Sequence, residues 1–525
     1  IIFMGSSCYT ITKFIKMKKF LSYFNKFAGP ATFLIIIFLF CYFRLKPSFL
    51  QTVPYTYDQG RDFIKAEEIA RDFNPVLTGP TTGIPGLNHG VWWYYFLAIP
   101  YLIFFGLPIG FSIFIFIFSL LQLLLFSYFL KKEFGWLPTL LFALLITGSP
   151  YFIRMSFFVI NGVLGFPFIL LFFYFVYLFL ETDNKKYLFW IFLSIGFMFE
   201  SELTNGIFTT IAFLIVIFLF KKIKLLISKN GLKNISLGLL IPTAPRILYE
   251  FIKGFPQSKI ISNYILNPTF HTPKPFDAIF RDRISLFKDY IAFVFPIDKP
   301  FIIYGLFFTS IIGITIAIIK SEKKIVKFFI FFPLMLILFF ILSCLYKDFF
   351  WDNYYEGIRY YFILTMTLGF YGFSLLKNKL IQKLSWLIFI FLFVINFFNL
   401  SNGIINKKYP PIDGLKKQMM TVEKMYLINK NKKDFCVRIY TPPVIPYTYN
   451  YLFDYYHDFK DLVRPTTNYV NNQCWYIFED EKDSNFQFRI DQFRKDHIPT
   501  TGKLIKVVSA HKDVVFELWE YYPNK

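Results

Sequence analysis

The sequence predicts an α-helical polytopic membrane protein with about 11–13 transmembrane helices, followed by a small C-terminal α/β extracytoplasmic domain. Of the 525 residues, 55% are hydrophobic and only 17% are charged, whereas soluble domains average about 25% charged. The mean hydropathy is +0.48, and apolar runs close to the ~20 residues of a membrane-spanning helix recur up to residue 402. The chain then becomes polar and mixed in pattern, which indicates a separate folded tail.

The formal net charge of +22 indicates membrane lipid as a partner. The basic residues form short clusters between apolar runs rather than one stripe. This distribution is typical of cytoplasmic loops that face anionic headgroups. We therefore exclude nucleic acid as a partner.

Orientation follows from the lysine-rich loops, because cytoplasmic loops carry an excess of Lys and Arg. The basic segment 1–29 has no acidic residue and predicts a cytoplasmic N-terminus, while the tail after residue 402 is expected outside. An even number of spans cannot connect these two ends, so the parity error must lie in the region 91–156, and the count stays at 11–13. The twelve candidate spans are 30–46, 91–106, 110–130, 136–150, 157–180, 187–200, 206–220, 236–252, 299–320, 328–346, 358–376 and 384–402.

Three parts are predicted: the N-terminus 1–29, a transmembrane domain 30–402 that includes a first extracytoplasmic loop 47–90, and the tail 403–525. In the tail, Cys436 and Cys474 can pair if the domain faces an oxidising space. The pattern of the tail predicts helices at 413–430 and 447–457, strands at 434–441 and 472–478, and a hairpin at 504–522.

Loop 47–90 holds the clearest candidates for chemistry. Asp58 and Asp62 are four residues apart, so a helix there places both carboxylates on one face, and Arg61 can keep one of them ionised. The amphipathic stretch 63–73 is typical of a helix lying in the membrane interface. The alternative is that the two aspartates only solvate a loop.

Three further residues carry two interpretations each. Glu200 and Glu202 end an apolar run, and ionisable residues in membrane segments usually have functional roles. Solvation at an external helix end explains them equally. His89 is either a substrate contact or part of a turn with Gly90.

The sequence around this loop resembles the GT-C superfamily of polyprenyl-phosphate-sugar-dependent glycosyltransferases. It is most similar to the protein O-mannosyltransferases and the lipid A aminoarabinose transferases. The similarity covers the topology of residues 30–400 and is motif-specific over 55–100. Its motifs are Tyr57-Asp58-Gln59-Gly60-Arg61-Asp62, Leu77-Thr78-Gly79-Pro80 and His89-Gly90-Val91-Trp92-Trp93-Tyr94-Tyr95.

This resemblance implies an inverting glycosyltransferase in a bacterial plasma membrane, with a polyprenyl-phosphate sugar as donor and a glycan, lipid or protein as acceptor. It makes Asp58 the catalytic base and Asp62 the reserve candidate. The second acidic motif of the family is missing, since 149–161 contains Arg154 and Asn161 but no carboxylate. No cofactor or metal ligand is therefore assigned, and dependence on a divalent ion stays open.

Such a transfer needs a base for the acceptor hydroxyl and cations for the departing phosphate. An arginine fork binds two phosphate oxygens, so Arg154, Arg246 and Arg359, near external helix ends, are candidates. The alternative for Arg246 is an ion pair with Glu250 within one helix. The alternative for Arg359 is a role as an interfacial anchor. We expect the aromatic run 92–95 to belong to an interfacial belt.

The rival hypothesis is a lipid-linked sugar flippase or another membrane transporter. Transporters commonly consist of repeated halves, with broken helices that meet near the membrane midplane. The sequence contains no visible internal repeat, and its acidic and aromatic residues concentrate in loop 47–90. Both observations favour the enzyme.

Overall fold

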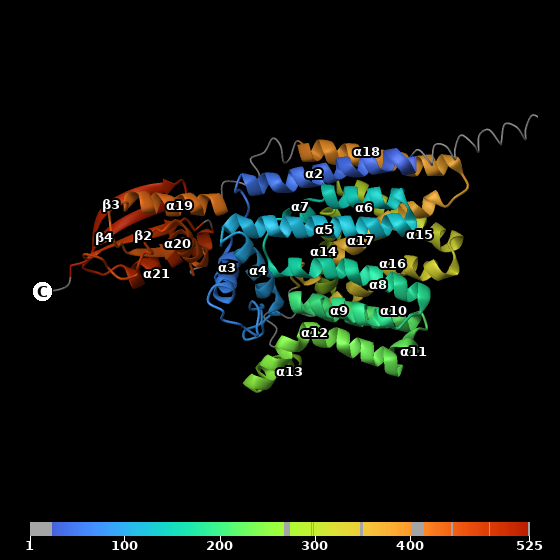
Figure 1. The fold of residues 1–525 in the computed structure, drawn as a ribbon, viewed down its shortest axis with the longest axis horizontal. Coiled ribbons are helices and arrows are strands. Elements are labelled where there is room, and N and C mark those ends of the chain that lie inside the picture. The colour runs from blue at the N-terminus through green and yellow to red at the C-terminus, as the bar shows by residue number, and fades with distance from the viewer. Residues whose placement is uncertain are drawn as a thin grey trace, which may run out of the picture.

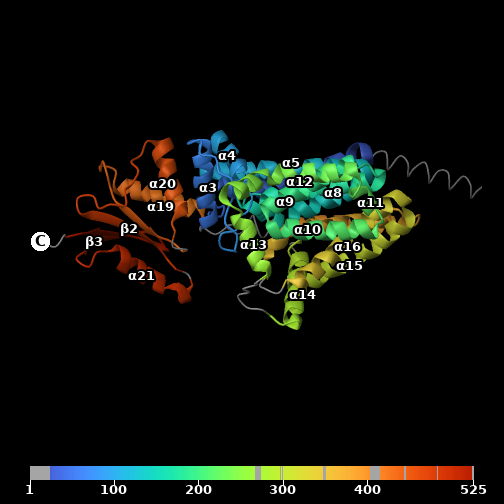
Figure 2. The same ribbon diagram turned by 90° about the horizontal axis from the view of Figure 1, so that it is seen from below.

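The computed structural model describes residues 24–266, 274–295, 297, 299–346, 350–401, 414–442, 445–481 and 483–522. Most of the predicted cytoplasmic segment 1–29, and the start of the predicted tail at 403–413, lie outside these residues. The described chain forms a bundle of roughly parallel helices with a smaller α/β domain at one end (Figures 1 and 2).

The bundle confirms an integral membrane protein with an α-helical fold. Seven of its described helical segments are long and apolar enough to cross a membrane. The helices of these segments are α2 (Gly29–Phe49), α5 (Pro108–Phe134), α8 (Gly165–Thr182), α12 (Lys229–Lys253), α15 (Pro300–Lys320), α16 (Lys323–Leu345) and α18 (Lys379–Leu400).

The other five predicted spans correspond to helices of 12–17 residues. One of them bears on the predicted number of spans. Helix α4 has 12 residues, about 18 Å of helix against a ~30 Å hydrocarbon layer, and it packs on α3 at the end of the bundle next to the α/β domain (Figure 1). Removing 91–106 from the predicted spans leaves the odd number that the predicted orientation requires. The five helices are α4 (Trp92–Ile103), α6 (Trp136–Gly148), α9 (Lys186–Ser201), α10 (Leu203–Leu219) and α17 (Ile358–Ser374).

Short elements connect the bundle helices. Helix α3 starts six residues before the predicted 63–73, because Thr56 and Gln59 form a capping box at its N-terminus. Asp58 and Asp62 therefore both lie in a helix. The remaining elements are α3 (Tyr57–Ala70), α7 (Pro150–Met155), η2 (Asn161–Leu164), α11 (Ile223–Leu226), α13 (Pro256–Leu266), α14 (Phe276–Ala292) and η3 (Asp352–Tyr355), with the π-helical turn η1 (Phe24–Ala28) ahead of α2.

The C-terminal domain is a four-stranded sheet in the order β1-β2-β4-β3, with β1 and β2 parallel and the other pairs antiparallel. The predicted hairpin is β3–β4, and Cys436 and Cys474 form a disulfide beside β1 and β2. Helix α21 was not predicted. The elements are α19 (Leu415–Ile428), β1 (Val437–Tyr440), α20 (Tyr447–Lys460), β2 (Gln473–Glu479), η5 (Ser484–Phe486), α21 (Phe488–His497), β3 (Lys503–His511) and β4 (Val514–Glu520).

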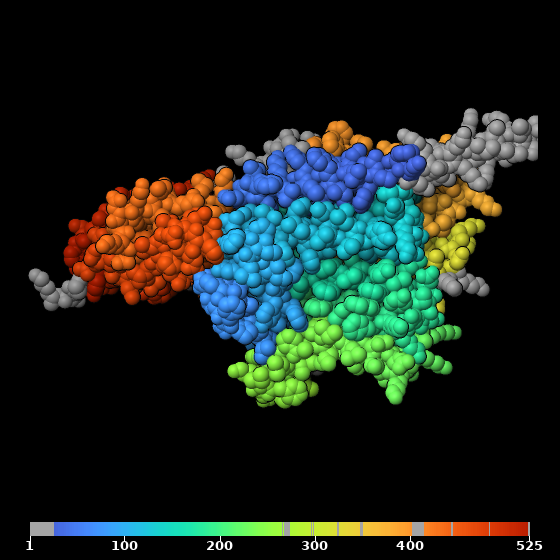
Figure 3. Space-filling view, in the orientation of Figure 1, coloured from blue at the N-terminus to red at the C-terminus, as the bar shows by residue number. Residues whose placement is uncertain are grey.

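The domain docks tightly on α3, and Figure 3 shows the two surfaces in contact. A Cβ atom at Gly60 would collide with the backbone of Tyr447 and Thr448 at the start of α20. Phe63 stacks on Phe111, with ring centroids 3.8 Å apart, and is 1% exposed. The prediction that α3 rests its apolar face on lipid is therefore wrong at Phe63, because protein covers this side chain.

We predict that Gly60→Ala loosens this docking. Alanine favours a helix, yet its methyl group has no room, and overpacking costs about 1–3 kcal/mol. Thermal unfolding of the detergent-solubilised protein is expected at a lower temperature, with faster protease release of the C-terminal fragment. The control is Gly83→Ala, because a Cβ there meets nothing within 4 Å. Equal behaviour of the two variants would contradict the packing argument.

Candidate functional site

The first turns of α3 hold two carboxylates on either side of one arginine. Arg61 Nη1 lies 2.9 Å from Asp58 Oδ1, and its Nη2 lies 2.8 Å from Asp62 Oδ1. The Asp58 side chain is 60% exposed, whereas that of Asp62 is 2% exposed. Arg61 therefore bridges the buried Asp62 carboxylate and the accessible Asp58 carboxylate, and this bridge holds Asp58 in place.

Asp62 is fully engaged by its neighbours. Its Oδ2 accepts a 2.7 Å hydrogen bond from Trp93 Nε1, and burial raises its pKa to about 6 against the opposing field of Arg61. Trp93 is 1% exposed, so the prediction of an interfacial belt is wrong for this residue. Asp58, rather than Asp62, can reach an incoming molecule.

A short segment between α3 and α4, residues 80–90 and called the strap below, connects α3 with the ends of the bundle helices. Thr81 and Asn88 form a β-bridge, and His89 N donates to Pro80 O at 2.8 Å. Gly90 N donates to Glu200 O at 2.7 Å, and a side chain at Gly90 would collide with the Glu200 carboxylate. The strap thus fixes His89 against the end of α9.

Glu200 pairs with an arginine from α12. Arg246 Nε and Nη2 donate to its two carboxylate oxygens at 2.9 and 3.0 Å. The expected alternative, a pair with Glu250 inside the same helix, is wrong. Glu250 instead accepts from the backbone N–H groups of Gln257 and Ser258 at the start of α13.

Three buried ionisable groups, His89, Glu202 and Glu356, lie next to the pair of Glu200 and Arg246. His89 Nε2 lies 4.0 Å from Glu202 Oε2, and burial, with the fields of Arg246 and Arg61, lowers the pKa of His89 to about 3. Burial and the nearby Glu356 carboxylate raise the pKa of Glu202 to about 8. A neutral histidine therefore faces a protonated glutamic acid at pH 7, and they form no ion pair.

Glu356 is a site candidate that the sequence analysis did not assign. It is 5% exposed, and burial raises its pKa to about 7. A side chain at Gly162 would collide with its carboxylate. Its position directly before a predicted span and three residues before Arg359 was the available signal.

The two remaining arginines differ in their contacts. Arg359 is 3% exposed, donates to both oxygens of Asp352, and stacks on Tyr151, so it is not an interfacial anchor. Arg154, on α7, is exposed and contacts the ring of Phe158. It forms no ion pair with a described residue, but its field reaches Glu356.

These groups form one polar cluster at the end of the bundle next to the α/β domain. It extends from Asp58 through His89 and Glu202 to Glu356 and Arg154. Within the described chain, no three His, Cys, Asp or Glu side chains have metal-binding geometry. The members of the cluster are Asp58, Arg61, Asp62, His89, Arg154, Glu200, Glu202, Arg246, Glu356 and Arg359.

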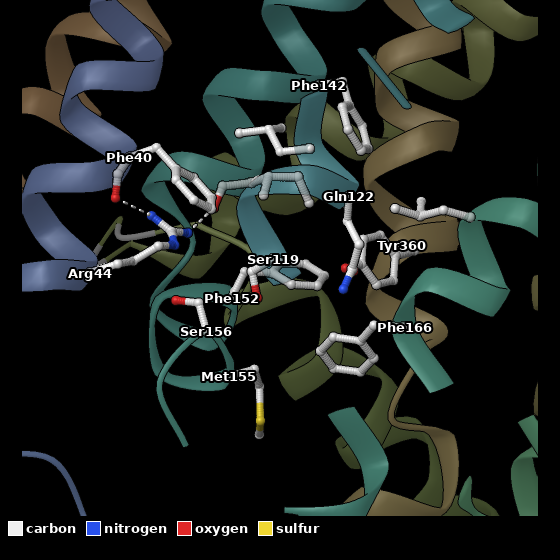
Figure 4. Close-up of a pocket in the computed structure, with 13 residues that line it drawn as sticks. Phe40, Arg44, Ser119, Gln122, Phe142, Phe152, Met155, Ser156, Phe166 and Tyr360 are labelled. Carbon is white, nitrogen blue, oxygen red and sulfur yellow. Dashed lines mark hydrogen bonds between the residues drawn. The ribbon is translucent and has the colours of Figure 1, made fainter. Parts of the chain in front are cut away.

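A separate small cavity of about 20 Å³ lies between α2, α5 and α6, and Figure 4 shows Arg44 at its edge. Arg44 is fully buried. It donates to the carbonyl oxygens of Ile146 and Thr147 at 2.7 and 3.2 Å, so it caps the C-terminus of α6. The space suffices for about one water molecule, and we assign Arg44 a structural role.

Comparison with known proteins identifies the fold. No family model and no curated protein matches the sequence. Two solved structures of ArnT from Cupriavidus metallidurans, one in the apo state and one bound to undecaprenyl phosphate, superpose with a TM-score of 0.57. Each alignment covers 94% of this chain and 97% of the other, at 8% identity.

The chain shares the fold of ArnT. ArnT is a lipid A aminoarabinose transferase, one of the two groups that the motifs of the first loop resemble. The predicted fold class is therefore confirmed. At this identity the likeness concerns the fold, and the roles of individual residues stay predictions.

We predict that Glu202→Gln changes the pH dependence of stability. Because folding raises the pKa of Glu202 from 4.5 to about 8, the folded state binds this proton more tightly. The free energy of unfolding therefore falls as the pH rises through this window, by at most about 1.4 kcal/mol for each pH unit. Glutamine removes this contribution, so melting temperatures between pH 5 and 8 are expected to vary less.

The matched control is Glu181→Gln, which removes a carboxylate from the end of α8 and should leave the pH profile of the wild type intact. An unchanged profile in Glu202→Gln would contradict the assignment of a protonated Glu202.

Proposed function

We propose that this chain is an inverting glycosyltransferase that moves a sugar from a polyprenyl-phosphate donor to an acceptor hydroxyl on the extracytoplasmic face. The observation that carries the proposal is the Asp58 carboxylate. It is 60% exposed, is held by Arg61, and adjoins a buried polar cluster, in a fold shared with a protein solved bound to undecaprenyl phosphate.

In this mechanism Asp58 is the general base. Its carboxylate takes the proton of the acceptor hydroxyl, and the oxygen then attacks the anomeric carbon of the donor sugar. The bond between that carbon and the phosphate oxygen breaks, and the phosphate leaves with its lipid. Asp62 acts through Arg61, since both of its oxygens are already engaged.

Arg154 is the best candidate for the departing phosphate. Arg61, Arg246 and Arg359 each form an ion pair with a carboxylate, whereas Arg154 is exposed and has no such pair among the described residues. A free guanidinium can bind two phosphate oxygens and stabilise their developing charge. Arg246 and Arg359 then hold the polar cluster together through their carboxylate partners.

The buried acids and the histidine suit the sugar rather than the phosphate. Neutral His89 and protonated Glu202 can donate and accept hydrogen bonds with sugar hydroxyls without adding charge. Glu200, neutralised by Arg246, fixes the strap that positions His89. Dependence on a divalent ion stays open.

We predict that Asp58→Asn lowers the transfer of labelled sugar from polyprenyl-phosphate donors by at least ~100-fold, since a positioned base contributes about 10²–10⁴ in rate. Asparagine keeps the size of the side chain but cannot take the proton. The assay uses membranes with matched protein levels and a set of lipid-linked sugars.

The control is Asp72→Asn, beyond the end of α3, where the carboxylate is 48% exposed and pairs with Arg71. Transfer by Asp58→Asn at the wild-type rate would remove Asp58 from the mechanism. If the wild type transfers no sugar but moves the lipid-linked donor across vesicles, the flippase hypothesis replaces the enzyme.

A further inference from the structure

A second cavity lies between the start of α3 and the C-terminal domain. Its volume is about 530 Å³, within the ~300–1,000 Å³ typical of small-molecule sites. One wall is the segment 54–57, and the domain supplies the others. The lining from the domain is Gly414, Lys417, Gln418, Thr441, Pro442, Ile445, Thr448, Glu479, Asp480 and Glu481.

The cavity contains an unsatisfied polar group. Gln418 is 8% exposed, and its Nε2 donates to Tyr55 O at 3.3 Å. Its Oε1 is buried and has no hydrogen-bond partner. A buried acceptor without a donor is unfavourable, so a ligand that donates a hydrogen bond here would gain binding free energy.

The charge of the lining selects against anions. Among the described lining residues, Glu479, Asp480 and Glu481 are acidic and Lys417 is basic. Lys417 Nζ lies 3.8 Å from Glu479 Oε1, and Glu481 is 6% exposed, with one carboxylate oxygen accepting from Tyr440. The site is therefore rich in hydrogen-bond acceptors and net negative, which suits hydroxyl groups and disfavours phosphates and carboxylates.

The cavity adjoins the first turn of α3, and its two walls are joined by backbone hydrogen bonds. Thr56 and Tyr57 line it, and Asp58 follows directly in the first turn of α3. On the opposite wall, Leu415 N donates to Val53 O at 3.1 Å and Lys416 N donates to Gln51 O at 3.0 Å. The two walls therefore cannot separate without breaking these bonds.

We propose that this cleft binds the acceptor as an uncharged sugar, with its reacting hydroxyl turned toward Asp58. The proposal rests on the glycosyltransferase function proposed above. The half-buried ring of Tyr57 supplies an apolar face for the sugar, and the carboxylates and Gln418 Oε1 accept hydrogen bonds from its hydroxyl groups. Donor and acceptor would then approach Asp58 from the polar cluster and from the C-terminal domain, respectively.

The test is glycan binding by the full chain in lipid nanodiscs, which does not depend on catalysis. The probes are neutral oligosaccharides and the same oligosaccharides carrying phosphate. We expect the wild type to retain neutral glycans, and Asp480→Lys to weaken that binding at least tenfold, because an exposed lining carboxylate becomes a cation. Gln418→Leu is expected to weaken it as well.

The control Asp491→Lys makes the same charge change on α21, outside the cleft lining, and should bind like the wild type. Retention of phosphorylated glycans only, no retention of any glycan, or equal binding by Asp480→Lys would each overturn the cleft assignment. A parallel transfer assay separates failure of the cleft assignment from failure of the proposed function. If the protein transfers sugar but the cleft variants bind glycan like the wild type, the glycosyltransferase proposal stands and the cleft assignment is wrong.

Discussion

The contact between α3 and α20 at Gly60 fixes the position of the helix that carries Asp58, Arg61 and Asp62. Only a residue without a side chain lets the two backbones meet there, and this meeting fixes the first turn of α3 between the helical bundle and the C-terminal domain. Arg61 then ties Asp58 to the buried Asp62, and Trp93 ties Asp62 to α4. The exposed carboxylate is consequently held by a rigid helix rather than by a mobile loop, as a general base requires.

Burial decides which charged side chains remain available to a substrate. A buried charge must have a partner or become neutral. Arg246 has a charged partner, Glu200, whereas burial favours the neutral forms of His89 and Glu202. What remains in the polar cluster are buried hydrogen-bonding groups and the exposed Arg154. This combination suits a sugar attached to a phosphate better than it suits an ion pathway, which would place its polar groups near the membrane midplane.

Much of the fold could be predicted from sequence, because apolar length and period are local properties. The sheet strands and the β3–β4 hairpin followed from short patterns, whereas the pairing of Cys436 with Cys474 was left conditional on an oxidising environment. The amphipathic helix of the first loop was predicted over 63–73, but its start at Tyr57 depends on the capping box of Thr56 and Gln59. Hydrophobicity does not distinguish a helix that packs on α3, such as α4, from one that crosses the membrane, so the sequence could not decide the span at 91–106. The pairing of Arg246 with Glu200 and the place of Glu356 depend on contacts between distant helices, which no local pattern encodes.

The most direct test of the account is a cryo-EM structure of the protein in lipid nanodiscs with a bound polyprenyl phosphate. The account predicts phosphate density in contact with Arg154 and inside the polar cluster, on the side of α3 away from the C-terminal domain, with Asp58 facing the sugar position. Density for the phosphate in the cleft of the C-terminal domain, or only on the lipid-facing surface remote from Asp58, would contradict it.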